Sequence, residues 1–337
     1  MDVIYFKNIN SIGGVEQFIW YLSKKYEFTL YYNSADTEQI KRLSQNIECR
    51  KYKEPIECDK FFCNYGLNIE VKAKEKYHIA HCDYKYVWFN PILYDEFKYI
   101  GVSKTVCDSF KELTRKDIEL IYNPLYLKKP KVSKYNDGKL HIISTTRLSR
   151  EKGLERIKKV VKKLDDAKID YVWEIYTNRP SEINSKNIIF KKPKLDILEE
   201  VAKADVLVQL SDCEAYCYSV VEALKVGTKV LVTDLPVFKE LGLKHGENAI
   251  ICNFNMDNLD LDMLKKEMNF TYNPPKDNWS KYLSTEKTYN KNELVEVKIL
   301  KNYTDIYLDR KLKKGTIEKM PKYRAGYLEA KGLVEWL

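Results

Sequence analysis

The chain has 337 residues, of which 44% are hydrophobic, so it can bury at least one full core, and its length favours two domains over one. Its formal net charge of +9 fits an anionic ligand or an anionic membrane surface without identifying either. No apolar run of about eighteen residues occurs, so no transmembrane helix is expected.

The N-terminus and the cysteines favour an intracellular protein. The opening MDVIYFKNIN lacks the basic stretch and the long apolar core of a signal peptide. The eight cysteines form no CxxC pair, and the nearest approach, Cys213 and Cys217, has the wrong spacing for structural zinc. We therefore expect reduced thiols, no bound metal and a cytoplasmic location, with peripheral contact at the inner membrane face as an alternative.

The first third of the chain alternates short apolar runs with amphipathic stretches, which is typical of βαβ units around a parallel sheet. Strands are predicted at 2–6, 28–32, 60–63, 77–81, 97–102 and 118–122, and helices at 14–25, 37–45 and 104–113. The polar and basic segment KKPKVSKYNDGK at 128–139 contains Pro and Gly and marks the clearest domain boundary.

Beyond that boundary the alternation starts again. Strands are predicted at 140–144, 171–176, 188–190, 206–210 and 229–233, and helices at 154–164, 194–203 and 219–225, the last ended by Gly227. Two such sets predict an α/β fold with two Rossmann-like, doubly wound domains facing a cleft, at 1–130 and 139–290. The tail, 294–337, predicts a small accessory α+β module with strands at 295–300, 315–318 and 333–336 and a helix at 322–330.

Two glutamates bracket a predicted strand-to-helix turn in SDCEAYCYSVVEALKVG. Glu214 follows the strand at 206–210, where ligands bind in open α/β sheets. Glu222 is expected in the first turn of the helix near Ser219, where the free backbone N–H groups of Tyr218, Ser219 and Val220 suit a phosphate. The alternative interpretations are a capping box between Ser219 and Glu222, which needs no ligand, and a solvated carboxylate at Glu214.

Two cations follow the strand at 140–144 in TTRLSREKGLERI. Arg147 can grip phosphate oxygens in a bidentate way, and Lys152 can act as a mobile point charge on a diphosphate. Gly153 allows the chain to pass closely at the start of the next helix. Each feature alone could be a charged surface loop, but both glutamates and both cations are predicted at the carboxyl ends of parallel strands facing one crevice.

Two weaker features lie in the first domain. Gly13 and Gly14 stand between a strand and a helix and permit close backbone approach to a ligand, although they are not a GxGxxG fingerprint and an ordinary tight turn is the alternative. His81 ends a predicted strand beside Asp83 and faces the predicted cleft. Without that context it would be read as a core or edge histidine.

Several segments resemble those of retaining GT-B glycosyltransferases of family 4. They are TTRLSREKG, ADVLVQLSDCEAYCYSVVEALKVGTKVLVTDLP and KHGENAII, in the expected order and spacing over most of 139–252. The resemblance extends more weakly to the first domain through SIGGVEQF, YHIAHCDY, YIGVSKTV and LIYNP. It departs at Ala215, where the family usually has Gly, and at Lys229, where it usually has Pro. Ala215 would resist a positive φ, so that loop could differ.

The resemblance implies a role for each candidate. Arg147 and Lys152 would bind the donor diphosphate, Glu222 the ribose hydroxyls, and Glu214 the transferred sugar. The catalytic residues implied are His81, Arg147, Lys152 and Glu214. The donor site implied comprises Gly13, Gly14, Arg147, Lys152, Lys192, Glu214, Tyr216, Cys217, Tyr218, Ser219 and Glu222.

The expected function is retaining transfer of a hexose-type sugar from a nucleotide diphosphate donor, a UDP-sugar on family frequency, to a saccharide, lipid-linked, polymer or other cell-surface-type acceptor. The absence of a DxD motif at a suitable strand end agrees with a metal-independent reaction, so no cofactor is expected beyond the nucleotide sugar. The first domain would form the acceptor side. A sugar-nucleotide epimerase and a non-catalytic saccharide-binding protein are the alternatives. Interspersed acids and bases give no firm indication of nucleic-acid binding.

Overall fold

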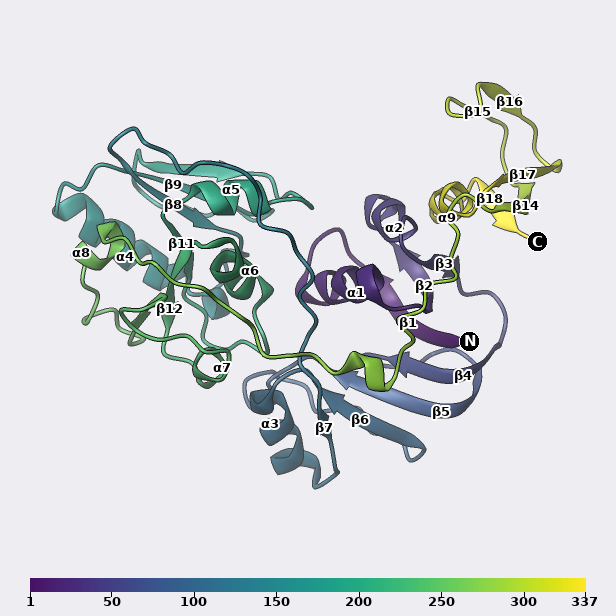
Figure 1. Cartoon of the computed structure of the whole chain (residues 1–337), viewed down its shortest axis with the longest axis horizontal. Helices are drawn as coiled ribbons and strands as arrows, with labels where there is room; N and C mark the ends of the chain where they lie inside the picture. The colour runs from purple at the N-terminus through teal and green to yellow at the C-terminus, as the bar shows by residue number, and fades with distance from the viewer.

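The computed structural model describes residues 1–337 as two large parallel sheets and a small third sheet (Figure 1). The first sheet has seven strands in the order β3-β2-β1-β4-β5-β6-β7. They are β1 (Asp2–Ile9), β2 (Thr29–Ala35), β3 (Glu48–Lys51), β4 (Ile56–Cys63), β5 (Val71–Ala80), β6 (Phe97–Gly101) and β7 (Glu119–Leu120). The helices between them are α1 (Gly14–Lys25), α2 (Thr37–Leu43) and α3 (Lys104–Thr114).

The second sheet has six parallel strands in the order β10-β9-β8-β11-β12-β13, which is the strand order of a dinucleotide-binding fold. They are β8 (Leu140–Ser144), β9 (Tyr171–Tyr176), β10 (Ile188–Lys191), β11 (Val206–Gln209), β12 (Lys229–Thr233) and β13 (Ala249–Cys252). The helices are α4 (Leu154–Asp166), α5 (Leu198–Lys203), α6 (Tyr218–Val226), α7 (Pro236–Glu240) and α8 (Asp262–Lys265). Strand order reverses between β8 and β11. Open α/β sheets bind ligands beyond the carboxyl ends of the strands at such a point, a region called the crevice below.

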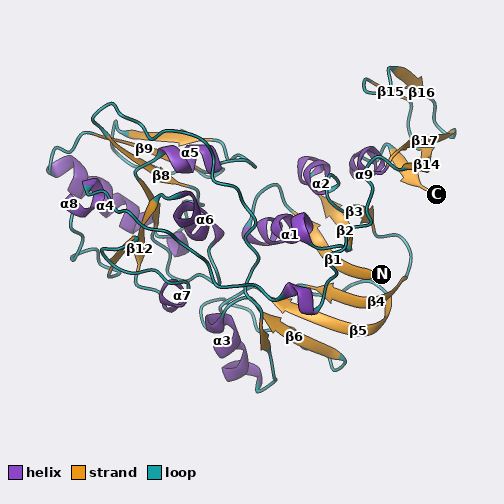
Figure 2. Cartoon of the chain, viewed as in Figure 1, coloured by secondary structure: helices purple, strands orange, loops and turns teal.

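Alternating side chains of the second sheet enter two different cores, because successive residues of a strand point to opposite faces. Ile142 and Leu231 join a cluster with helix α4, whereas Ile143 and Leu207 join a cluster with α5 and α6. The strands are therefore buried on both faces, as the helices in Figure 2 indicate. The cluster containing α6 also includes α1 and continues into the first sheet, so one apolar core joins the two domains.

After α8 the chain returns to the first domain. Trp279 is fully buried there, with its ring 5.3 Å from Phe18 and its indole N–H donating to the Tyr122 carbonyl. Asp277 accepts hydrogen bonds from Tyr26 and Tyr126. This returning segment lies within the range predicted for the second domain, but its side chains pack on the first.

The tail forms a three-stranded antiparallel sheet, β17-β14-β18, with one helix and a separate two-stranded hairpin. The elements are β14 (Leu294–Ile299), β15 (Tyr303–Asp305), β16 (Arg310–Leu312), β17 (Ile317–Pro321), α9 (Lys322–Ala330) and β18 (Val334–Trp336). Helix α9 packs on α2 and on β3, an edge strand of the first sheet. There the Glu329 carboxylate accepts a 2.9 Å hydrogen bond from the Lys51 backbone N–H and pairs with Lys53.

The predicted α/β class with two doubly wound sheets and a small C-terminal module is confirmed. Strands β8, β9 and β12 and helices α1 and α9 begin and end where the sequence predicted. Strands β3 and β13, the hairpin β15–β16 and the helices α7 and α8 were not predicted. No helix of the chain combines the length and the apolarity that crossing a membrane requires.

Candidate functional site

The carboxyl ends of β8 and β11 are joined by a buried ion pair. Lys152 Nζ lies 2.7 Å from Glu214 Oε1, and the two side chains are only 21% and 11% exposed. The same carboxylate oxygen accepts hydrogen bonds from Ser211 and Gln209. Burial works against a charge on Lys152, but Glu214 outweighs it, so the pKa of Lys152 is raised. The predicted cation and carboxylate therefore lie together in the crevice.

Gly153 fixes the two loops at this contact. It has a φ of 83°, and a Cβ at this position would come within 1.9 Å of the Leu210 carbonyl oxygen. Arg156, one turn further on, donates to the same carbonyl at 2.7 Å and pairs with Asp212. Only glycine fits between the two loops at this position. Glycine at 153 is therefore required for Lys152 to reach Glu214.

Arg147 lies on the same loop but away from this pair. Its guanidinium is 3.7 Å from the Glu151 carboxylate, four residues along, and its side chain is 56% exposed. It is therefore free to reorient toward an anion at the mouth of the crevice, at little cost to the fold. Its predicted role in binding a diphosphate stays a prediction.

Helix α6 begins one residue earlier than predicted, and its first turn differs from a capping box. Cys217 is the N-cap, with a φ of 67°, and no side chain caps the helix. The positive φ thus falls on Cys217, whereas Ala215 does not adopt one. The Val220 N–H donates to the Cys217 carbonyl, so of the three amides expected to be free only those of Tyr218 and Ser219 remain so.

Glu222 lies in the second turn of α6 and contacts the other domain. Its Oε1 accepts a 2.6 Å hydrogen bond from the Tyr21 hydroxyl and a second one from the Gln17 side-chain amide, both on α1. Burial raises the pKa of the Glu222 carboxyl, although these two hydrogen bonds and the charges of Arg42 and Lys24 act in the opposite direction. The predicted capping partner, Ser219, instead contacts the Cys217 thiol at 3.3 Å.

Other predicted donor-site side chains are dispersed around α6 and β10. The Tyr216 ring is 2% exposed and its hydroxyl has no hydrogen-bond partner. The Tyr218 hydroxyl donates to the Pro124 carbonyl of the interdomain connection, so this side chain points away from the α6 N-terminus. Lys192 is exposed and follows β10, and no ion pair holds it.

The first-domain wall is formed by the turn before α1 and the residues after β5. A Cβ at Gly13 would come within 2.2 Å of the Glu16 carboxylate, whereas Gly14 faces open space. His81 follows β5, its ring is 4.9 Å from Phe18, and its Nε2 is buried without a partner. Burial lowers the pKa of His81 to about 3, so the imidazole is neutral near pH 7 and can donate or accept a hydrogen bond.

The loop that carries Glu214 also contains Cys213. The pKa of the Cys213 thiol, in the loop after β11, is raised to about 11 by burial first, then by Glu214, and further by Asp83 of the first domain. The Asp83 carboxylate, two residues after His81, therefore contributes to the electrostatics of the loop that carries Glu214.

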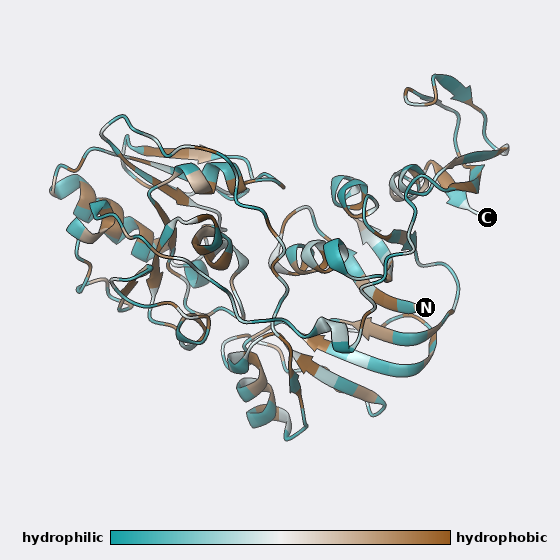
Figure 3. Ribbon diagram, in the orientation of Figure 1, coloured by the Kyte–Doolittle hydropathy of each residue, from teal (hydrophilic) through white to brown (hydrophobic).

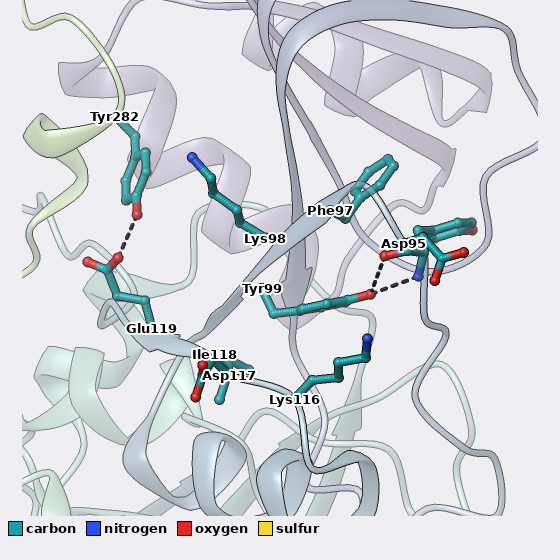
Figure 4. A pocket seen from close by; sticks show the side chains of 10 residues that line it. Asp95, Phe97, Lys98, Tyr99, Lys116, Asp117, Ile118, Glu119 and Tyr282 are labelled. Carbon is teal, nitrogen blue, oxygen red and sulfur yellow. Dashed lines mark hydrogen bonds between the residues drawn. The ribbon is translucent and has the colours of Figure 1, made fainter.

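A separate hollow of about 440 Å³ lies elsewhere on the first domain (Figure 4). Its lining comes from the first residues of β6 and β7, from the residues just before these strands and from Tyr282, so it lies at the amino ends of the two strands. There the Tyr282 hydroxyl donates to Glu119, and the Tyr99 hydroxyl bonds the Tyr94 backbone. It contains none of the predicted site residues and is distinct from the crevice. No group of three or more His, Cys, Asp or Glu side chains is arranged to hold a metal ion.

The comparisons with known proteins address the second domain most directly. Residues 127–269 match the family model described as glycosyl transferases group 1. The chain carries a glycosyltransferase domain of this group. The match contains Lys152, Glu214 and Glu222, so the crevice described above lies within the glycosyltransferase domain. No curated protein matches the chain in sequence.

Two solved structures show the same architecture. HepE of Anabaena, determined in complex with UDP and glucose, is 13% identical, with 75% of this chain and 86% of that chain covered and a TM-score of 0.58. WaaG, a glycosyltransferase involved in lipopolysaccharide biosynthesis, is 10% identical, with 78% and 88% covered and a TM-score of 0.57. At these identities the likeness shows the fold, and it confirms that this glycosyltransferase has the GT-B architecture.

Sequence reasoning missed four residues of the crevice and its border. Arg156, Ser211, Gln17 and Tyr21 all contact the predicted loops or carboxylates. Gln17 and Tyr21 stand four residues apart, on one side of α1, which is a detectable helical pattern. Their partner on α6 lies more than two hundred residues away, so no local pattern could have identified it.

Proposed function

We propose that this glycosyltransferase moves a hexose-type sugar from a nucleotide diphosphate donor, a UDP-sugar, to a saccharide or another cell-surface-type acceptor, with retention at the anomeric carbon. The observation that carries the proposal is the Lys152–Glu214 pair at the strand-order reversal of the matched domain. HepE, which shares the fold, was determined with UDP-glucose, and this supports the choice of base.

In this proposal the charge that develops on the leaving diphosphate is stabilised by the chain itself. Lys152 and Arg147 supply positive charge, and the free amides of Tyr218 and Ser219 supply donors at the N-terminus of α6. No metal or organic cofactor is required beyond the donor. Glu214 holds Lys152 in the crevice and offers its remaining acceptor positions to the hydroxyls of the sugar. His81, from the opposite wall, is neutral and suits a hydrogen bond to the same sugar.

The acceptor is proposed to bind on the first-domain side and to be a saccharide, a lipid-linked sugar or a polymer of the kind assembled in polysaccharide biosynthesis. Peripheral contact with an anionic membrane is part of this proposal. The net charge of +9 supports it, as do four lysines around the β15–β16 hairpin that form no ion pair. They are Lys301, Lys311, Lys313 and Lys314.

The test is Arg147→Ala, because this side chain is exposed and its removal leaves the fold intact. Loss of one charge-stabilising group lowers transfer about a hundredfold or more. The measurement is the turnover of UDP-glucose and of other nucleotide sugars, selected first by the rise in melting temperature that they cause. Arg150→Ala, on the same exposed loop, is the matched control and should keep most of the activity. Near-normal transfer by Arg147→Ala would remove the diphosphate assignment.

The same assay separates the two alternatives. An epimerase would convert a nucleotide sugar without any added acceptor, and a saccharide-binding protein would bind it with neither transfer nor hydrolysis. No contact in the crevice favours either of them over transfer.

A further inference from the structure

The buried carboxylate of Glu222, a predicted donor ligand, is already held by side chains of the opposite domain. Its Oε1 accepts two hydrogen bonds, one from the Tyr21 hydroxyl at 2.6 Å and one from the Gln17 side-chain amide. Its Oε2 accepts no hydrogen bond. Unlike the polar atoms of the chain that are fully buried without a partner, it keeps some contact with solvent. One oxygen is therefore fixed by α1, while the other is left without a hydrogen-bond partner in a side chain that is 6% exposed.

The donors on α1 are themselves fixed in orientation. The Gln17 side-chain oxygen lies 3.4 Å from Arg42 Nη1, and because arginine can only donate, the amide nitrogen must face Glu222. The Arg42 guanidinium is stacked 3.9 Å above the Trp20 ring. The Tyr21 ring packs 5.4 Å from the Tyr218 ring of α6. Burial and the neighbouring Glu222 raise the pKa of Tyr21, so its hydroxyl keeps the proton that it donates.

From this geometry we infer that Gln17 and Tyr21 are positioning residues for the donor: they lock one oxygen of Glu222 so that the other faces the ribose. Through these two side chains the first domain takes part in nucleotide recognition indirectly, by way of Glu222. Separation of α1 from α6 would release the carboxylate, so recognition of the ribose depends on the two domains being together. This inference rests on the proposed function, because it requires a nucleoside diphosphate donor.

A purely structural role for the contact makes a different prediction. If the two hydrogen bonds only fasten the domains, their loss weakens the protein and any bound nucleotide alike. If they position Glu222, their loss removes the contribution of the ribose hydroxyls and leaves the contribution of the diphosphate. The discriminating quantity is therefore the affinity ratio between UDP and an analogue that lacks a ribose hydroxyl.

The experiment measures the Kd of UDP, 2′-deoxy-UDP and 3′-deoxy-UDP by calorimetry for the full chain and two variants, Tyr21→Phe and Gln17→Met. The unmodified chain should prefer UDP to at least one deoxy analogue by about tenfold, the effect of one hydrogen bond to a charged group. In each variant the Kd of UDP should rise toward the Kd of the deoxy analogue, and the Kd of the deoxy analogue itself should not change. With UDP-sugar, KM should rise while kcat changes little.

Tyr26→Phe is the matched control, since Tyr26 ends the same helix and its buried hydroxyl donates to Asp277 at 2.8 Å, away from Glu222. It should leave the affinity ratio unchanged. The inference is overturned if the affinity ratio between UDP and the deoxy analogue is the same in both test variants as in the parent. It is also overturned if the parent binds UDP but shows no preference for the ribose hydroxyls. Failure of the parent to bind any nucleoside diphosphate overturns the proposed function itself.

Discussion

Glu214 and Glu222 belong to one short segment, yet the two carboxylates are held in opposite ways. Glu214 is neutralised within its own domain by Lys152, at the meeting point of two loops. Glu222 has no cation in contact and is held by uncharged donors from the other domain. The comparison shows that the first carboxylate depends on the local packing of one sheet, whereas the second depends on how the two domains meet.

The comparison is tested most strongly at Lys152. Lys152→Met leaves the mostly buried Glu214 without its counter-charge and should lower the free energy of unfolding by about 2–3 kcal/mol. Replacing Glu214 by Gln in the same chain should restore part of this loss, because the stranded charge is then gone. Urea unfolding at pH 7 measures both. Lys158→Met, which breaks an exposed pair with Glu155, is the control and should cost under about 0.5 kcal/mol. Equal losses at the two lysines would contradict the buried pair.

The second test exploits the raised pKa of Glu222. At a pH below the ordinary glutamate pKa of about 4.5 the carboxyl is protonated in both folded and unfolded chains, so Glu222→Gln should differ little from the parent. As the pH rises, the unfolded chain loses its proton first, and the parent loses stability up to the folded-state pKa. The variant should therefore gain stability relative to the parent as the pH rises above 4.5.

Thermal unfolding across this pH range provides the measurement, and Glu200→Gln provides a control of opposite sign. Hydrogen bonding to Lys194 lowers the pKa of Glu200, so that substitution should lose relative stability as the pH rises. The same trend in both variants would show that burial does not raise the pKa of Glu222.

The smallest effect is expected at a third glutamate, Glu240, which contacts the other domain as Glu222 does but lies nearer the surface. Glu240 of α7 accepts hydrogen bonds from the Thr105 N–H and hydroxyl and from the Lys104 N–H, at the N-terminus of α3. Glu240→Ala should lower the free energy of unfolding by about 1 kcal/mol, the usual contribution of an acidic group at a helix N-terminus. Glu247→Ala, from an exposed pair with Lys244, is the control. If urea unfolding shows the same loss of free energy of unfolding for both substitutions, the α7–α3 contact does not stabilise the fold.

The sequence predicted the two sheets because each strand is a short apolar run and each helix has its own amphipathic pattern. It also predicted that Lys152 and Glu214 would lie in one crevice, because both follow strands at the reversal point. It could not predict the positive φ of Cys217, since the expectation at Ala215 came from residue type and the actual turn is set by packing. The Glu222 contacts and the return of Trp279 to the first sheet join residues far apart in sequence and depend on tertiary packing alone.

Figure 3 shows strand β16 of the tail in teal, the colour of hydrophilic residues. Helix α9 is the part of the tail that packs on the first domain. Helix α9 occupies the flank of strand β3, and Glu329 takes up one of its outward-facing amides. A chain that ends before residue 294 would expose the edge of β3, and exposed edge strands tend to pair with strands of other chains. Truncation would therefore produce self-association, so the tail's part in acceptor binding is better studied by point substitutions in β15–β16 than by deletion.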